Sequence, residues 1–281
     1  MRPHQWLKNL LVFVPAVAAH SPGALLPSFV AFVAFCLAAS SVYLLNDLLD
    51  IEADRNHPRK KLRPFAAGLI PVSPGLVHAA ILIIAAFALA LTTTPQFLAV
   101  LAGYLVLTFA YSLYLKRKLM IDIWILATLY TTRIIAGGVA SEVPISEWLL
   151  ALSMFIFLSL AAVKRLSELT DLVKRGATET AGRGYRTSDI PVILGVVLAA
   201  GYSSVLVLAL YISNDKITAL YARPELLWLI CPLLLYWVSR VAMISYRGEM
   251  HDDPIVFAVK DKVSLAIFGL AGVLAVMGAV A

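Results

Sequence analysis

The chain has 281 residues, of which 61% are hydrophobic and only 14% carry a charge, and its mean hydropathy is +0.87. Soluble domains are about half apolar and about a quarter charged, so this composition excludes an ordinary soluble enzyme and predicts an integral membrane protein. The formal net charge is +6, but in a membrane protein the location of the charges is more informative than their sum.

Nine apolar runs have about the length that a helix needs to cross a bilayer, which is roughly 20 residues. In chain order we predict the spans Gln5–His20, Ala24–Asp47, Pro74–Thr93, Phe97–Leu115, Ile121–Ala140, Ser146–Val163, Pro191–Ile212, Glu225–Ile244 and Lys262–Val280. The first run follows basic residues, as a signal peptide would. Because Pro15 interrupts it and a second span follows almost at once, we interpret it as a transmembrane helix. Residues 1–281 are expected to form one all-α polytopic membrane domain.

The distribution of Lys and Arg orients these spans, since such residues concentrate in cytoplasmic loops. With the N-terminus inside, 20 of the 23 Lys and Arg residues fall in cytoplasmic segments. Lys216 and Arg223 fall outside, and Arg133 lies within a span. We therefore predict a cytoplasmic N-terminus and a functional site at the cytoplasmic face.

The second span ends in the motif NDLLDIEAD, at residues 46–54. Asp47, Asp50 and Asp54 have the spacing i, i+3 and i+7, so a helix places them on one face, with Asn46 at its edge. Stacked carboxylates repel each other, and the repulsion is stronger where the dielectric constant is low. Mg²⁺ relieves such repulsion and commonly joins carboxylates to substrate phosphates. We predict that Asn46, Asp47, Asp50 and Asp54 hold Mg²⁺ on a diphosphate.

A basic segment, RNHPRKKLRP, follows at residues 55–64. Its charges would contact the anionic leaflet or bind substrate phosphate. Arg63 stands just before the small-residue stretch FAAG and is predicted to bind phosphate, and Lys60 suits either role. The alternative for the acidic motif is a solvated helix end with salt bridges to Arg55, Arg59 or Arg63.

The fifth span carries Asp122 at its start and Arg133 within it. They are eleven residues apart, about three helical turns, and so share a face. A charge in mid-span costs about 3 kcal/mol or more unless it is paired or faces a polar cavity. We predict that Arg133 lines a substrate cavity, and the alternative is a structural ion pair with an acid on another helix.

Several segments together resemble the UbiA-type intramembrane prenyltransferase superfamily, and within it the branch of decaprenyl-phosphate phosphoribosyltransferases. They are RPHQWLKN, NDLLDIEADRNHPRKKLRPFAAG, YSLYLKRKLMID, RIIAGGVA, VKRLSEL and HDDPIVFAVKDK. The resemblance covers the whole chain. It implies nine transmembrane helices and a Mg²⁺-dependent site that faces the cytoplasm, in the bacterial cytoplasmic membrane. It also implies that Lys8, otherwise interpretable as part of a helix end beside Trp6, contacts a phosphate.

The chain departs from members of that superfamily that prenylate aromatic rings, which carry a second Asp-rich motif after the sixth helix. Here the region reads VKRLSELTD. Lys164, Arg165 and Glu168 are predicted to form a mixed site for a substrate that brings its own phosphate, because Arg and Lys bind phosphate well. The alternative is an i, i+4 ion pair between Lys164 and Glu168. Arg183 and Arg186, in a loop with several glycines, are further candidates for substrate contact.

The predicted reaction is transfer of 5-phosphoribose from phosphoribosyl diphosphate to a polyprenyl phosphate, with Mg²⁺ as cofactor. The acceptor is already an anion, so no strong general base is required. The main alternative is a UbiA-type enzyme that alkylates an aromatic or quinone precursor with a prenyl diphosphate. A transporter or lipid scaffold ranks last, because the polar residues crowd one face of the membrane rather than its midplane. We expect no nucleic-acid partner, and the oligomeric state is left open.

Near the last span, Asp253 and Pro254 are predicted to be the N-cap and the first residue of a short helix.

Overall fold

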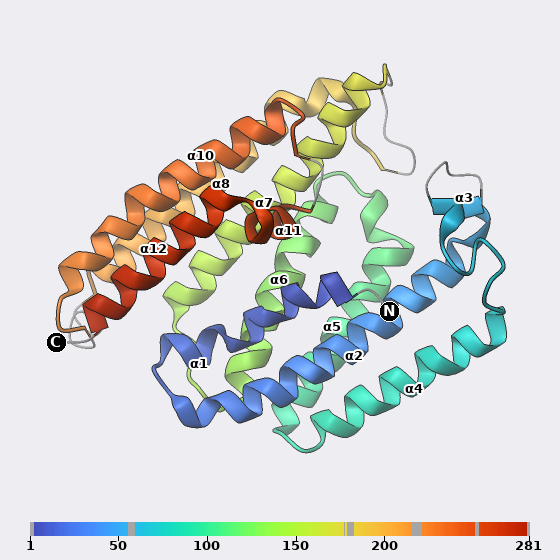
Figure 1. Cartoon of the computed structure of the whole chain (residues 1–281), viewed down its shortest axis with the longest axis horizontal. Coiled ribbons are helices and arrows are strands. Elements are labelled where there is room, and N and C mark those ends of the chain that lie inside the picture. The colour runs from blue at the N-terminus through green and yellow to red at the C-terminus, as the bar shows by residue number, and fades with distance from the viewer. Residues whose placement is uncertain are drawn as a thin grey trace. The chain divides into compact units, whose positions relative to one another are not determined.

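A computed structural model describes residues 3–55, 60–176, 178, 183–214, 221–250 and 253–279, apart from the side chains of residues 3–5, 53 and 60 (Figure 1). Within these residues the secondary-structure elements are all helices, as the composition predicts. With η for 3₁₀-helices, the elements are η1 (Pro3–Phe13), α1 (Val14–Ala18), η2 (Pro22–Ala24), α2 (Leu25–Leu49), α3 (Ile51–Arg55), η3 (Lys60–Leu62), α4 (Val72–Ala90), α5 (Pro95–Leu113), η4 (Leu115–Arg117), α6 (Ile121–Ala140), α7 (Glu147–Lys174), η5 (Thr187–Asp189), α8 (Ile190–Ile212), η6 (Pro224–Leu229), α10 (Ile230–Tyr246), α11 (Pro254–Lys260) and α12 (Lys262–Ala279).

In the described part of the chain, eight helices are long and apolar enough to cross a membrane, and they correspond to the second to ninth predicted spans. The first predicted span, Gln5–His20, differs from them. It is formed by η1 and α1, and its apolar stretch Trp6–Ala18 is shorter than the other eight. The count of nine spans and the inside location of the N-terminus stay predictions.

The 3₁₀ geometry of η1 compensates for the small number of residues. A 3₁₀-helix rises about 2.0 Å per residue, against about 1.5 Å in an α-helix. The 11 residues of η1 and the 5 of α1 would therefore extend about 30 Å, which is roughly the thickness of the hydrocarbon core. With fewer residues than a standard transmembrane helix, such a segment would cover about the same distance.

Helix α7 is longer than predicted, because it continues past the apolar run Ser146–Val163 through the polar sequence KRLSELTDLVK. The Ser146 side chain caps its start by accepting the Leu149 N–H at 3.1 Å. Gly176, at φ 69°, provides the left-handed residue that commonly follows a helix C-terminus. The candidate residues Lys164, Arg165 and Glu168 therefore lie on a continuous helix rather than in a loop.

The chain divides into two compact units. The first comprises Met1–Tyr114 and Thr132–Ile145, and the second comprises Leu115–Thr131 and Ser146–Ala281. Helix α6 therefore contributes residues 121–131 to the second unit and residues 132–140 to the first. The single domain expected from the sequence stays a prediction.

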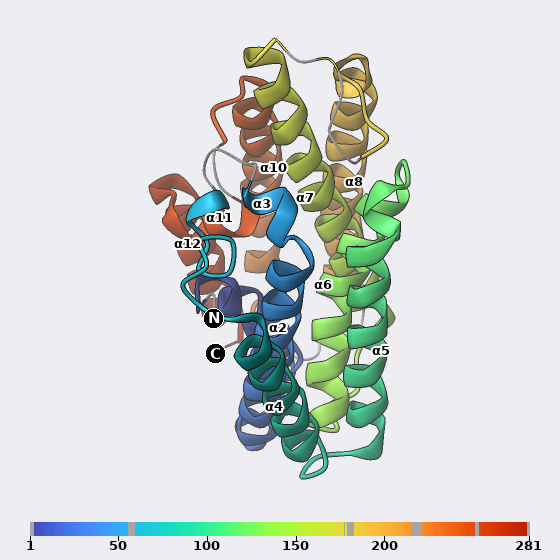
Figure 2. The ribbon, with the colours of Figure 1, turned by 90° about the vertical axis from the view of Figure 1, so that its right-hand side faces the viewer.

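In the first unit, α2 packs against η1, α4 and α5, and both views show α4 alongside it (Figures 1 and 2). The most apolar stretch of α2 is 56% buried, against 22% for α4, so α2 is the central helix and α4 offers its apolar side chains to lipid. Gly137 on α6 lies very close to η1. A methyl group in its place would overlap the carbonyl oxygen of Val12.

In the second unit, α7 packs along α8, and α10 packs on α7, α8 and α12 (Figure 1). Gly201 on α8 leaves room for Val238 on α10 and Ser159 on α7, because an added Cβ atom would meet both side chains. Trp237 Nε1 donates a hydrogen bond to Ser264 Oγ at 2.9 Å, which joins α10 to α12. Small residues and side-chain hydrogen bonds are the usual means of helix association in membranes.

A bidentate ion pair ties α10 to the junction of α11 and α12. Arg240 donates from Nη1 and Nη2 to the two carboxylate oxygens of Asp261, at 2.7 and 3.0 Å. Asp261 also accepts hydrogen bonds from the backbone N–H and the hydroxyl of Ser264, both at 2.8 Å. These bonds, and first of all the one from Arg240, hold the pKa of Asp261 below its usual value.

Replacement of Gly137 by Ala tests the close approach of η1 to α6. The overlap with the Val12 carbonyl should destabilise the protein by about 1–3 kcal/mol, as overpacking does in other cores, and lower its melting temperature. Cys36 and Cys231 are both buried, so a thiol-reactive fluorophore reports unfolding directly. Gly103→Ala is the matched control, because nothing lies within 4 Å of its added Cβ atom. Equal melting temperatures for the two variants would contradict the interpretation.

Replacement of Asp261 by Asn tests the pKa of its carboxylate. Because the folded-state pKa lies below the unfolded value of about 3.9, the charged form stabilises the fold above that pH, and this contribution is lost as pH falls through the folded-state pKa. The difference in melting temperature between wild type and variant should be largest above about pH 5 and shrink below about pH 4. Asp171→Asn is the control, because Asp171 forms an exposed ion pair with Arg175. This variant should have nearly the melting temperature of wild type at every pH. A difference that is constant with pH would refute the assignment.

Candidate active site

The acidic motif lies where α2 gives way to α3. Helix α2 ends at Leu49 and Asp50 is its C-cap, yet the four-residue hydrogen-bond spacing continues through the motif. The Asp50 N–H donates to the Asn46 carbonyl at 2.9 Å, and the Asp54 N–H donates to the Asp50 carbonyl at 2.8 Å. The helical spacing on which the prediction rests is therefore kept. Asp54 is only 2% exposed, whereas Asn46, Asp47 and Asp50 are half-buried.

Arg63 links two of these carboxylates. Its Nη1 atom lies 2.6 Å from Oδ2 of Asp54 and 3.2 Å from Oδ1 of Asp47. One positively charged nitrogen thus lies where two acids converge, and it offsets part of their mutual repulsion. The sequence predicted that Arg63 binds phosphate and left salt bridges as the alternative, and the structure contains the salt bridges.

The loop that carries Arg63 is anchored by Phe65, whose side chain is buried. A Cβ atom at Gly75 on α4 would lie 2.7 Å from the Phe65 ring, so the absence of a side chain at Gly75 makes room for that ring. Arg55 on α3 donates from Nε to the Ala66 carbonyl at 3.2 Å. Packing and a hydrogen bond therefore hold the backbone just after Arg63 against the two helices that flank the loop.

The oxygen atoms of the acidic motif fit a hard cation. Asp47 and Asp54 present carboxylate oxygens to one point, which a cationic nitrogen of Arg63 occupies. Within the described residues, no group of three or more acidic, His or Cys side chains is placed to hold a metal ion. The described side chains would thus supply one or two carboxylates, and phosphate oxygens and water would complete the shell, as is usual for Mg²⁺.

Arg133 lies in a buried polar cluster of the first unit. It donates from Nε to Oδ1 of Asn9 at 2.9 Å and from Nη2 to the hydroxyl of Tyr104 at 3.0 Å. Asn9 is fully buried and also donates from Nδ2 to Sγ of Cys36 at 3.3 Å. Lys8, the next residue along η1, is buried as well. These contacts bind Arg133 to η1 and α5, and they hold the backbone next to Lys8.

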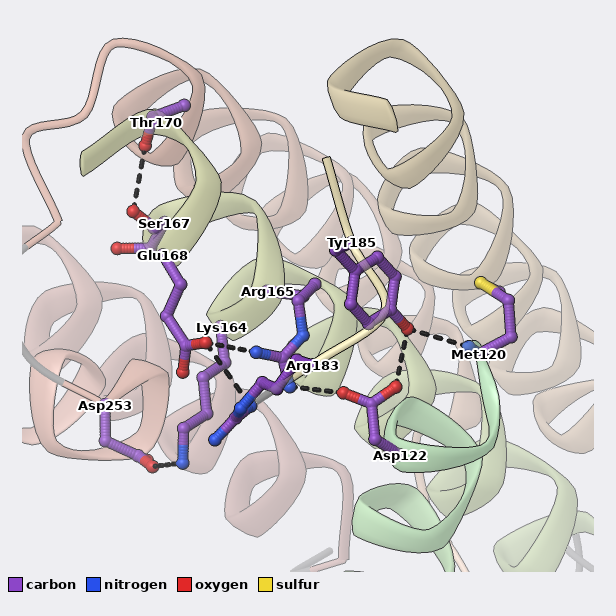
Figure 3. A network of polar contacts seen from close by, with 10 residues as sticks. All are labelled: Met120, Asp122, Lys164, Arg165, Ser167, Glu168, Thr170, Arg183, Tyr185 and Asp253. Atoms are coloured by element: carbon purple, nitrogen blue, oxygen red, sulfur yellow. Dashed lines mark hydrogen bonds and ion pairs between the residues drawn. The ribbon is translucent and has the colours of Figure 1, made fainter. Parts of the chain in front are cut away.

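A second network of charged residues lies in the second unit, and Figure 3 shows its members. Arg165 on α7 is fully buried and donates to the carboxylates of Asp122, on α6, and Glu168, one turn further along α7. The Tyr185 hydroxyl donates to Asp122 at 2.5 Å and accepts the Met120 N–H at 2.9 Å. The Tyr185 ring also lies under the Arg165 guanidinium, 5.1 Å from its central carbon.

Burial, followed by the hydrogen bond to Asp122, raises the pKa of Tyr185 above its usual value. The phenol is therefore protonated at neutral pH and stays a hydrogen-bond donor. Loss of one member of a buried ion pair leaves an uncompensated charge, which costs about 3–5 kcal/mol. Asp122 and Arg165 consequently fix each other's position.

The same network reaches more exposed residues. Glu168 also pairs with Arg183, whose Nη1 lies 3.3 Å from Oε2, and Lys164 Nζ lies 3.4 Å from Oδ2 of Asp253. These partners replace the i, i+4 pair between Lys164 and Glu168 that was the alternative from the sequence (Figure 3). Asp253 is the N-cap of α11, as predicted, and accepts the Ile255 N–H at 3.2 Å.

Two further predicted substrate contacts are Arg186 and Lys60. Arg186 is exposed at the N-cap of η5, where its backbone N–H donates to Asp189 at 2.8 Å. Lys60 begins η3, but its side chain lies outside the described part of the chain.

The sequence did not predict the residues that hold the candidate site in place. Asp122 could be suspected of having a partner, since an acid at the start of an apolar span requires one. No spacing in the sequence identified Arg165 as that partner. Tyr185 and Tyr104 gave no signal, because a tyrosine in a loop or an apolar helix is common. Their roles depend on contacts between residues far apart in the sequence.

The UbiA prenyltransferase family matches residues 10–260. Nodulation protein NoeC of Azorhizobium caulinodans is 38% identical over 273 residues, which cover 96% of this chain and 89% of that protein. Decaprenyl-phosphate phosphoribosyltransferase of Mycolicibacterium smegmatis is 41% identical over 184 residues, 63% of this chain and 58% of that protein.

Among solved structures, the UbiA homolog from Archaeoglobus fulgidus bound to GPP and Mg²⁺ is similar at a TM-score of 0.69. The superposition covers 97% of this chain and 96% of that one, at 16% sequence identity. At this identity the likeness concerns the fold.

Replacement of Tyr185 by Phe tests how the second network is held. The variant keeps the ring under Arg165 but removes the hydroxyl that serves Asp122 and Met120. Because Asp122 is buried, we expect a loss of about 1–3 kcal/mol in stability and a lower melting temperature. Tyr202→Phe is the control, since it removes the contact with Ser239 on an exposed helix face and should shift the melting temperature less. Equal shifts in melting temperature for the two variants would contradict the stabilising role of the Tyr185 hydroxyl in the second network.

Proposed function

The chain belongs to the UbiA prenyltransferase family, and we propose that it transfers 5-phosphoribose from phosphoribosyl diphosphate to a polyprenyl phosphate. That it is an integral membrane protein of a transferase family follows from its apolar helices and the family match. The identity of donor and acceptor, the dependence on Mg²⁺ and the cytoplasmic location of the reaction are the proposal.

The observation that carries the proposal is a pair of cations in the second network, Lys164 on α7 and Arg183 in the loop after it. Lys164 and Arg183 have side chains that are 34% and 25% exposed, so both can reach a ligand. A lipid phosphate suits these cations, because Lys offers a point charge and Arg a bidentate fork. A neutral aromatic acceptor would offer these cations no phosphate to bind beyond their ion pairs with Asp253 and Glu168. Arg165 has no exposed surface, and we assign it to the positioning of Glu168 rather than to phosphate contact.

Similarity to a decaprenyl-phosphate phosphoribosyltransferase supports the same substrates. The chain spans about 58% of the length of that relative, so its substrates are carried over here as a proposal. NoeC matches nearly the whole chain, and its name states no substrate.

The acidic motif would bind the donor. Asp47 and Asp54 would hold Mg²⁺, which would neutralise charge on the leaving diphosphate. Asn46 and Asp50 stay predicted ligands, since no group of three acidic, His or Cys side chains converges among the described residues. Lys8, Arg63 and Arg133 would serve the same donor, Arg63 by direct contact with phosphate and Arg133 by holding η1. Arg186 and Lys60 stay candidate contacts on the strength of their charge alone.

In the proposed step, an anionic oxygen of the acceptor phosphate attacks the anomeric carbon of the ribose. The bond from that carbon to the acceptor oxygen forms, and the bond to diphosphate breaks. No proton has to be removed, because a phosphate monoester is already ionised at neutral pH. Binding, orientation and charge neutralisation by these residues would therefore supply most of the rate.

The location of the basic residues supports a cytoplasmic reaction. The acidic motif and the basic network both lie in segments that carry the excess of Lys and Arg, which marks the cytoplasmic side of membrane proteins. For a bacterial chain, the proposed reaction would take place at the inner face of the cytoplasmic membrane.

The second candidate is a prenyltransferase that alkylates an aromatic or quinone precursor. It is favoured by the fold, since the similar Archaeoglobus fulgidus protein was solved with GPP and Mg²⁺. It requires a second acidic pair to hold a prenyl diphosphate, and the region after the sixth predicted span carries Lys164 and Arg165 there instead.

The experiment supplies the purified protein with Mg²⁺, a polyprenyl phosphate and labelled phosphoribosyl diphosphate. A labelled lipid is the expected product. Asp47→Asn should lower the rate by about 100-fold or more, as loss of one transition-state charge contact typically does. Glu52→Gln, an exposed acid in the same motif, should change the rate by about twofold or less. Prenylation of an aromatic acid from a prenyl diphosphate, without a labelled lipid, would overturn the proposal.

A further inference from the structure

Arg63 occupies the point at which Asp47 and Asp54 converge. Its Nη1 lies within 2.6 and 3.2 Å of the two carboxylates, and Asp54 is almost completely buried. A metal ion held by Oδ1 of Asp47 and Oδ2 of Asp54 would have to take the place of this guanidinium nitrogen, because two cations cannot occupy the same point between these oxygen atoms. The arrangement therefore sets Arg63 and a metal ion in competition for the same oxygen atoms.

We infer that Arg63 makes metal binding at the acidic motif conditional on diphosphate. The guanidinium holds Asp47 and Asp54 together, and a complex of Mg²⁺ with diphosphate displaces it, whereas Mg²⁺ alone does not. The inference rests on the proposed function for its assumption that the donor is a diphosphate.

The number of protein ligands supports this coupling. In the part of the chain that the structure describes, no third acidic, His or Cys side chain joins a metal-holding group, and Mg²⁺ releases its water reluctantly and requires close to six oxygen ligands. Two carboxylates that already have a cationic partner are a poor site for it. Diphosphate adds several anionic oxygens to the metal, and it also offers the displaced guanidinium a new partner.

The side chain of Arg63 can move without its loop. It is 26% exposed, and arginine has several rotatable bonds, so a change of rotamer suffices to release the acids. The backbone after it stays anchored through Phe65, which fills the space left by Gly75. The displaced guanidinium would therefore stay close to the acidic motif, where the diphosphate binds.

Reciprocity between linked ligands makes the inference measurable. If diphosphate increases the affinity for the metal, the metal increases the affinity for diphosphate by the same factor. Removal of the Arg63 charge should strengthen binding of the metal alone and reduce this factor. A residue that only binds phosphate would instead weaken diphosphate binding and leave the affinity for the metal alone unchanged.

The test is equilibrium dialysis of the full-length protein in nanodiscs against Mn²⁺, which accepts the same oxygen ligands as Mg²⁺. It is run with and without inorganic diphosphate. We expect wild type to retain Mn²⁺ about tenfold more tightly or better in the presence of diphosphate, within the usual range of coupling between ligands. Arg63→Gln should bind Mn²⁺ alone several-fold more tightly than wild type and show a smaller effect of diphosphate.

Lys61→Gln is the matched control, because it removes the same charge from an exposed side chain two residues away, and it should behave as wild type. Arg63→Lys keeps the charge and should retain most of the coupling. Tight binding of Mn²⁺ by wild type without diphosphate would overturn the inference without the need for any variant. An unchanged or weaker affinity of Arg63→Gln for Mn²⁺ alone would overturn it as well.

The outcome is independent of the transfer reaction, because dialysis requires no acceptor and no ribose. Coupling without phosphoribose transfer would leave the inference in place and refute the proposed donor. Phosphoribose transfer without coupling between diphosphate and metal would refute the inference and leave the proposed donor in place.

Discussion

Charge buried in apolar surroundings must be compensated, and both candidate clusters depend on this constraint. Asp122 and Arg165 have no exposed surface and are paired with each other. Asp54 is nearly as buried and is paired with Arg63. Such pairs contribute little net stability, because desolvation offsets their attraction, but separation of the partners is strongly unfavourable. Buried pairs therefore specify where charged side chains lie.

The two clusters use this constraint differently. In the second unit, the core of the network is buried, because Tyr185 donates to Asp122 and accepts the Met120 N–H, whereas its outer members Lys164, Glu168 and Arg183 are partly exposed. In the first unit, the cation that compensates the acids lies on a loop and is itself partly exposed. The first arrangement suits a rigid support for phosphate-binding residues. The second suits an exchange of one cation for another.

Much of the fold was predictable from hydropathy, because in lipid a backbone must satisfy its own hydrogen bonds and an apolar run of sufficient length therefore forms a helix. Two elements departed from that rule. The first span contains a long 3₁₀-helix seated against Gly137, and α7 extends eleven residues beyond its predicted end at Val163 to Lys174. Neither departure was visible in composition, since one follows from a close backbone approach and the other from packing of a polar helical segment.

The sequence by itself determined the membrane class, the locations of most spans and the two charged motifs, because these depend on local composition and on helical spacing. It also determined that the acids of residues 46–54 need a compensating cation. Only the tertiary structure decided which cation lies there, since Arg63 reaches Asp47 and Asp54 through a loop anchored by Phe65. Likewise, only the fold brought Tyr185 and Asp122 to Arg165. Pairing between distant residues depends on how helices pack, and no local spacing encodes it.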